Sequence, residues 1–167
     1  MNFQFAHDYD IDVPTYWKIF LSEPFNVEMY RDLKMKKREV VKQEDDGKVF
    51  VRWTHIEPTT PIPGWLQAVV KGSDYTEKNR LVWADNAMEV VIETSMFKDR
   101  FQMRGMYTVS PLDGGARCRR EFKGDVKVSI PLLGGRIEKY MMEQLRDSYE
   151  IAARTTRKWI ADYKAQK

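Results

Sequence analysis

The chain has 167 residues, of which 43% are apolar and 32% charged, and this balance excludes a disordered or fibrous protein. Its 28 basic and 25 acidic residues leave a net charge of only +3, so charge gives no indication of nucleic-acid binding. The length is typical of one domain, which we expect to span residues 1–167 and to bury a sizeable core.

Cysteine and histidine are scarce, which limits the covalent and metal chemistry open to the chain. Cys118 is the only cysteine, so neither an intramolecular disulfide nor a thiolate metal cluster can form. His7 and His55 lie on different predicted strands without a further ligand at suitable spacing, and we expect no metal and no cofactor. The chain shows no signal-peptide pattern and no apolar run of about eighteen residues, which predicts a cytoplasmic protein without a membrane span.

The N-terminal segment predicts a strand followed by two short helices. Apolar and polar residues alternate from Phe3 to Ile11, which is the period of a half-buried strand. Asp12 as the N-cap and Pro14 in the first turn then predict a helix. A second short helix follows over about 24–33.

A hairpin and a proline-rich connection come next. The strand-like segments 36–44 and 48–57 flank the turn Asp45-Asp46-Gly47, which predicts a β-hairpin. The prolines of segment 58–72 interrupt the strand pattern, and a short apolar turn of helix is predicted over 65–70.

Four further strands are predicted before the C-terminal helix. They are separated by turn residues and cover about 75–85, 87–96, 101–110 and 116–130.

The last part of the chain predicts one long amphipathic helix over about 135–164, with apolar and charged residues on opposite sides. At about 1.5 Å per residue this helix is about 45 Å long, more than a domain of this size needs to close its core. Its apolar stripe carries Ser148, Ala152 and Thr155 in the middle, where a close-packed core favours Leu or Ile. The small residues leave room for a bound molecule.

The order of these elements indicates the fold class. It is an α+β helix-grip fold, with a curved antiparallel sheet of about seven strands around the long C-terminal helix and two short helices after strand 1. From Phe3 to Trp159 the pattern resembles the START-like (SRPBCC) superfamily, whose members include the birch pollen allergen, lipid-transfer domains and polyketide cyclases. The segment from Gly124 to Glu138 is similar to an uncharacterised bacterial branch of DUF2505-like proteins. The resemblance implies a deep hydrophobic pocket between sheet and helix, but no particular reaction.

Apolar residues alternate along the predicted strands and are expected to face the helix: Trp53, Trp83, Met88, Val90, Ile92, Met96, Met103 and Tyr107. The nine methionines suit an adaptable lining for a flexible ligand. The same residues also suit a filled core, so residue types alone do not decide between packing and pocket. His55 shares a face with Trp53, where it is either a polar tip in the cavity or an ordinary strand-end histidine.

Arg120 shares its strand face with Phe122 and other apolar residues. If it points inward it needs a partner, because an isolated buried charge is too costly. Glu89 or Glu93 across the sheet is one candidate partner, and the anionic head group of a ligand is another. An exposed position at the strand end remains a third alternative.

Trp65 and Leu66 follow two prolines, at a place where members of the resembling superfamily often carry the gate to the pocket. If exposed, this pair suits transient contact with a membrane surface. Alternatively, the loop packs its tryptophan against the sheet. The basic cluster 34–38 is either a solvated strand start or a contact with an anionic membrane surface.

These observations predict non-catalytic binding or transfer of a hydrophobic small molecule, such as a lipid, a sterol or an isoprenoid-like species. The alternatives are a cyclase or aromatase that uses the same cavity, and a protein-interaction module. The expected partners are the small-molecule ligand and transiently a membrane surface, but no nucleic acid. The expected ligand-binding residues are Trp53, His55, Trp65, Leu66, Trp83, Val90, Ile92, Met103, Tyr107, Arg120, Met141, Leu145, Ser148, Ala152 and Thr155.

Overall fold

The computed structural model describes residues 1–59, 62–70, 72–94 and 96–166. The strands of this part of the chain are β1 (Asn2–Tyr9), β2 (Met35–Asp45), β3 (Val49–Pro58), β4 (Tyr75–Val82), β5 (Ala87–Glu93), β6 (Phe101–Leu112) and β7 (Arg117–Val128). The helices are α1 (Val13–Leu21), α2 (Glu23–Asp32), α3 (Gly64–Gln67) and α4 (Gly134–Ala165).

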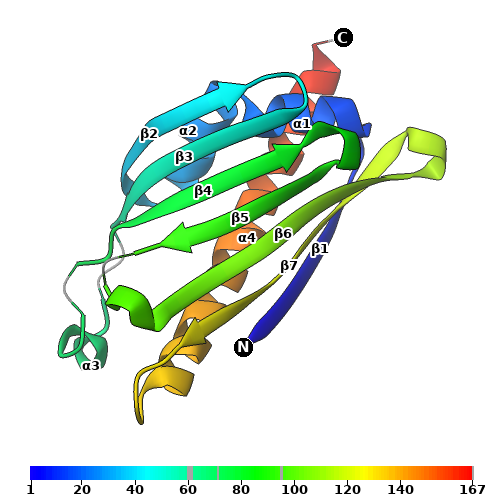
Figure 1. The fold of residues 1–167 in the computed structure, drawn as a ribbon. Helices are drawn as coiled ribbons and strands as arrows, with labels where there is room; N and C mark the ends of the chain where they lie inside the picture. The colour runs from blue at the N-terminus through cyan, green and yellow to red at the C-terminus, as the bar shows by residue number, and fades with distance from the viewer. Residues whose placement is uncertain (60–61, 71, 95, 167) are drawn as a thin grey trace.

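The strands form one antiparallel sheet in the order β1-β7-β6-β5-β4-β3-β2. Figure 1 shows this sheet curving around α4, which runs across its inner face, while α1 and α2 cover one end. The predicted α+β helix-grip fold is therefore confirmed. No helix in the described segments combines the length and the apolarity that a membrane span requires.

Local sequence signals explain where α1 begins and how the chain turns from α1 into α2. The Asp12 carboxylate caps α1 by accepting a hydrogen bond from the Thr15 backbone N–H at 2.8 Å. The buried Asn26 side chain donates to the carbonyl oxygens of Phe20 and Ser22 at 2.9 and 2.7 Å. These bonds satisfy carbonyl groups where α1 ends and fix the direction in which α2 starts.

Several predicted boundaries differ from the structure. β4 ends at Val82 instead of residue 85, because residues 83–85 form a 3₁₀ turn that Asn86 closes in the left-handed conformation at φ 49°. β5 ends at Glu93 instead of residue 96, and the short helix α3 ends at Gln67 instead of residue 70.

Helix α4 has two apolar faces, whereas the sequence pattern suggested one stripe. The more deeply buried face includes Tyr149, Ala153 and Ile160. The Tyr149 ring packs against rings of β1 and β7, for instance Phe5 at 5.1 Å between centroids. Most of the predicted stripe lies beside this face and is half-buried, for instance at Ser148, although Thr155 is buried. One face therefore packs against β1 and β7, and the other remains open toward the rest of the sheet.

Two glycines allow close contact where β6 and β7 pair. Gly105 and Gly124 lie directly opposite each other in the antiparallel register. A Cβ atom on Gly124 would lie 2.1 Å from the Arg104 carbonyl oxygen and 2.6 Å from the Phe3 ring. Because neither neighbour is the free end of a flexible side chain, the strand itself would have to shift.

We predict that Gly124→Ala lowers the free energy of unfolding by about 2 kcal/mol, because the added methyl group overpacks the sheet. Urea denaturation measures the change. The matched control is Gly135→Ala in the first turn of α4, where no atom lies within 4 Å of the added Cβ. This variant is expected to be neutral or stabilising by up to about 1 kcal/mol. Equal unfolding midpoints for the two variants would contradict the packing argument.

Candidate functional site

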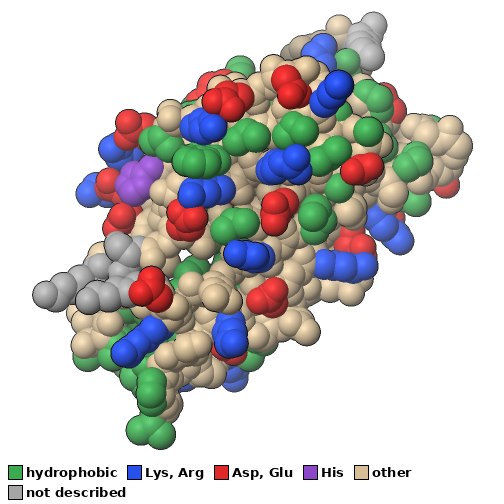
Figure 2. Space-filling view, viewed as in Figure 1, with side chains coloured by type: hydrophobic (Ala, Val, Ile, Leu, Met, Phe, Trp, Pro, Cys, Tyr) green, Lys and Arg blue, Asp and Glu red, His purple; other side chains and the backbone are tan. Residues whose placement is uncertain are grey.

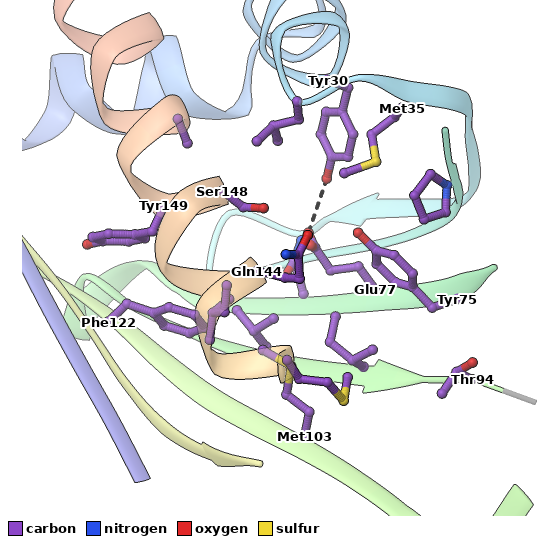
Figure 3. Close-up of a pocket in the computed structure, with 18 of the residues that line it drawn as sticks. Tyr30, Met35, Tyr75, Glu77, Thr94, Met103, Phe122, Gln144, Ser148 and Tyr149 are labelled. Carbon is purple, nitrogen blue, oxygen red and sulfur yellow. Dashed lines mark hydrogen bonds between the residues drawn. The ribbon is translucent and has the colours of Figure 1, made fainter. Parts of the chain in front are cut away.

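A cavity of about 310 Å³ lies between α4, α2 and the inner face of the sheet. Its lining is mainly apolar, with Met29 from α2, Met88 from β5, Phe101 and Met103 from β6, and Met141 from α4. Figure 3 shows side chains from these elements pointing into one space, with α4 crossing beside it. A cavity of this size and lining suits a small apolar molecule.

Most of the residues predicted from the sequence to bind a ligand line this cavity: Leu66, Val90, Ile92, Met103, Tyr107, Arg120, Met141, Leu145, Ser148 and Ala152. The small side chains of Ser148 and Ala152 lie on the half-buried face of α4. The cavity occupies the space that a large side chain at either position would fill. Contact between these residues and a ligand stays a prediction.

Trp53 and His55 do not face the cavity, and the predicted orientation of β3 is wrong. The inner face of β3 carries Phe50, Arg52 and Thr54, all buried. Trp53 lies on the outer face, where the Lys78 ammonium sits 4.3 Å from its ring centroid. Figure 2 shows that this outer face mixes charges of both signs with apolar side chains. Strand parity places Trp53 and His55 together, but it does not tell which side of the sheet they occupy.

Three more predicted residues lie outside the cavity because each contacts another element. The Trp83 indole N–H donates to the Asp45 carboxylate at 3.0 Å. The Thr155 hydroxyl donates to Asp32 at 2.7 Å and so joins α4 to α2. Trp65 packs under the Arg136 guanidinium, 4.1 Å from the ring centroid. Of the predicted gate pair, only Leu66 lines the cavity, where it is buried, and the gate stays a prediction.

Arg120 points inward and is almost completely buried, with 1% of its surface exposed. Its Nε donates to the Tyr149 hydroxyl at 3.1 Å and its Nη1 to the Tyr16 hydroxyl at 3.2 Å. The rings of Tyr149 and Tyr9 lie 4.4 and 5.3 Å from the guanidinium carbon. The expected partners Glu89 and Glu93 are instead exposed. Phenols and aromatic faces therefore replace a carboxylate around this cation.

The tyrosines around Arg120 are neutral at physiological pH. Burial raises the pKa of Tyr9 to about 12. It also raises the pKa values of Tyr16, Tyr107 and Tyr149. No negative charge within salt-bridge distance balances Arg120 in the described part of the chain. Its Nη2 is buried and finds no hydrogen-bond acceptor there.

A second polar cluster in the cavity was not predicted from the sequence. Tyr75, Glu77 and Asn79 from β4 and Tyr30 from α2 line the cavity. Asn79 donates to the Glu77 carboxylate at 2.6 Å, and the Tyr30 hydroxyl lies 3.4 Å from the same oxygen. Tyr75, Glu77 and Asn79 share their face of β4 with Leu81, which is fully buried. The alternation along this strand could therefore have predicted that the three polar side chains point inward.

The remaining chemistry-bearing residues provide no alternative site. Among the residues that the structure describes, no cluster of three His, Cys, Asp or Glu side chains is placed to hold a metal ion. Burial raises the pKa of the Cys118 thiol to about 11, so it stays protonated and is a poor nucleophile at neutral pH. In the basic cluster 34–38, Arg38 pairs with Glu23 at 2.6 Å and Lys37 with Glu39 at 2.8 Å.

We predict that Tyr149→Phe lowers the free energy of unfolding by about 2 kcal/mol, because it leaves the buried Nε of Arg120 without an acceptor. Thermal and urea denaturation measure this loss. Tyr140→Phe on the same helix is the control, since no described residue bonds to the half-buried Tyr140 hydroxyl. Its expected change is below about 0.5 kcal/mol. A similar small change in Tyr149→Phe would show that the phenol does not stabilise Arg120.

Solved structures with the same fold extend across almost the whole chain. The Zhui aromatase/cyclase from Streptomyces sp. R1128 is similar at a TM-score of 0.66 and 12% identity, covering 96% of this chain and 93% of the other. A START superfamily protein from Mycobacterium smegmatis has a TM-score of 0.59 and 14% identity, with 97% and 98% covered. Norcoclaurine synthase from Thalictrum flavum has a TM-score of 0.62 and 15% identity, with 96% and 86% covered.

These likenesses confirm the predicted helix-grip fold, which the chain shares with a START superfamily protein and an aromatase/cyclase. At such low identity they show nothing more specific. A comparison with curated proteins found no match. The sequence does match one protein family, described as a protein of unknown function, over residues 4–160. The chain therefore belongs to the DUF2505 family.

Proposed function

We propose that this protein binds a hydrophobic small molecule, such as a lipid or an isoprenoid-like species, in the cavity between α4 and the sheet. The observation that carries the proposal is the apolar cavity of about 310 Å³ that α4 spans with small side chains. Burial of roughly 300 Å² of ligand surface at about 25 cal/mol per Å² contributes several kcal/mol before association costs. Micromolar binding corresponds to about 8 kcal/mol, so polar contacts with the ligand have to add to this apolar contribution.

Arg120 is proposed as the anchor of an acidic head group at the deep end of the cavity. It lines the cavity, and its Nη2 has no acceptor among the described residues. A buried cation surrounded by neutral phenols is stabilised by any anion that reaches it. A carboxylate or phosphate group of the ligand has the required charge and hydrogen-bond acceptors.

Entry is proposed to occur where α3 meets the start of α4. Figure 1 shows α3 and the turn between β7 and α4 at the same end of the molecule. The buried Leu66 side chain lines the cavity, while Leu132 in the turn is fully exposed. An exposed leucine in this turn suits transient contact with a membrane surface during ligand exchange.

We predict that the purified protein carries an apolar ligand with an acidic group, and that Ala152→Trp loses this ligand. The indole ring would occupy the cavity directly. Native mass spectrometry followed by solvent extraction measures ligand occupancy and identifies the molecule.

Arg154→Trp is the matched control, because Arg154 is exposed on the same helix two residues away. It should retain the ligand. A protein that is empty as purified and binds nothing from lipid extracts would contradict the binding proposal. A stoichiometric ligand without an acidic group would contradict only the role of Arg120.

One observation favours a second candidate function, an enzyme of the cyclase type. Glu77 and the neutral phenol of Tyr30 converge inside the cavity with 3.4 Å between their oxygens. A carboxylate base beside a phenol donor is able to move a proton on a bound substrate. If the protein is an enzyme, Glu77→Gln should carry a different chemical species from the wild type. If it is a carrier, both should carry the same molecule.

A further inference from the structure

The polar cluster on β4 lines the same cavity as Arg120. Figure 3 shows Tyr30, Glu77 and Tyr75 directed toward one another, with Tyr149 and Phe122 on the other side of α4. The bonds of Glu77 go to Asn79 and Tyr30, whereas those of Arg120 go to Tyr16 and Tyr149. The two polar groups of the cavity therefore share no hydrogen-bond partner and form separate subsites.

The hydrogen bonds of the cluster leave acceptors unused. An ionised carboxylate only accepts hydrogen bonds, so the amide nitrogen of Asn79 must be the group that faces Glu77 at 2.6 Å. This orientation turns the Asn79 Oδ1 away, and it is buried without a donor among the described residues. Asn79 lines the cavity and is 3% exposed. A buried acceptor without a donor costs free energy that a bound donor would recover.

The cluster also holds unused donors. Burial raises the pKa values of Tyr30 and Tyr75 above the usual range for tyrosine, so both phenols keep their protons. Figure 3 shows the Tyr75 hydroxyl pointing into the cavity. The Nε of Arg52 is likewise buried without an acceptor in the described segments. The subsite thus offers both acceptors and donors to one guest group.

A buried arginine lies on the strand next to Glu77. Arg52 pairs with Asn79 in the register of β3 and β4, and it is therefore a diagonal neighbour of Glu77 on the inner face. Arg52 is 3% exposed, and its own hydrogen bonds go to the neutral Asn26 side chain and the Leu21 carbonyl oxygen. A carboxylate and a guanidinium thus lie on neighbouring strands. The subsite therefore calls for a guest group that makes hydrogen bonds, and not for one that carries a charge.

From this geometry we infer that Glu77, Asn79 and Tyr75 bind a hydroxyl group of the mainly apolar ligand. A hydroxyl donates one hydrogen bond and accepts others, which matches the free acceptor of Asn79 and the free donor of Tyr75. This inference rests on the proposed binding function and adds a selectivity for alcohols to it.

Three probes of equal chain length test the inference on the full-length wild-type protein: 1-decanol, decyl methyl ether and decylamine. Displacement of the dye 1-anilinonaphthalene-8-sulfonate measures their affinities. Decanol should bind at least about tenfold more tightly than the ether, because only the alcohol donates a hydrogen bond. Decylamine should not bind more tightly than decanol.

Glu77→Met should remove the preference for the alcohol while it retains affinity for the ether. The control is Glu93→Met, the same substitution at an exposed carboxylate that pairs with Lys78 at 2.7 Å. This control should keep the wild-type preference. Circular dichroism confirms the fold of each variant, and if Glu77→Met does not fold, the comparison of wild-type affinities alone decides.

The outcomes separate the two proposals. Equal affinities for decanol and its ether overturn the hydroxyl subsite and leave hydrophobic binding intact. Amine binding more than about tenfold tighter than alcohol binding overturns it in favour of a cation site. Failure of all three probes to displace the dye counts against the binding function itself, and the inference falls with it.

Discussion

The buried Arg120 is the constraint on which the arrangement of the helices depends. A guanidinium with 1% exposure must keep its hydrogen bonds in the folded state, because burial shields it from the solvent that would replace them. Its bonds to Tyr16 and Tyr149 tie α1 and α4 to β7 at one point. The ring of Tyr9 from β1 covers the same group. Displacement of any of these elements would leave an unpaired charge in an apolar interior. The contacts around Arg120 therefore keep α4 from moving closer to the sheet.

Polar contacts along α4 then explain why the cavity stays open. Near the start of the helix, Glu138 accepts a hydrogen bond from the Val128 backbone N–H at 2.8 Å. Toward its end, Thr155 bonds to Asp32 at 2.7 Å and the Trp159 indole N–H donates to Glu28 at 2.9 Å. These directional bonds hold the helix on its two flanks, β7 and α2. The middle of the helix is left without large side chains on the face that looks toward β4 and β5, and apolar packing does not close that gap.

The sequence predicted the elements well because their signals are local. Alternation, the Asp12 cap and the amphipathic period each depend on neighbouring residues only. The side of the sheet that a strand face occupies depends on partners elsewhere, and so Trp53 was placed inside although Arg52 occupies the inner face. Arg52 is tolerated there because Asn26 on α2 and the Leu21 carbonyl bind it. The phenols around Arg120 could not be predicted for the same reason, since they come from four separate elements.

Proteins that share this fold with the chain share few of its residues. A shared scaffold leaves the chemistry to a few inward positions. In this chain the polar side chains that line the cavity include Arg120 on β7 and Glu77 on β4. Each of these two side chains has, in itself or beside it, a buried polar atom that costs free energy. Apolar side chains at these positions would make a core that is purely structural more stable. Among the described residues, Nη2 of Arg120 and Oδ1 of Asn79 have no hydrogen-bond partner, and the proposed guest molecule would supply the missing acceptor and donor.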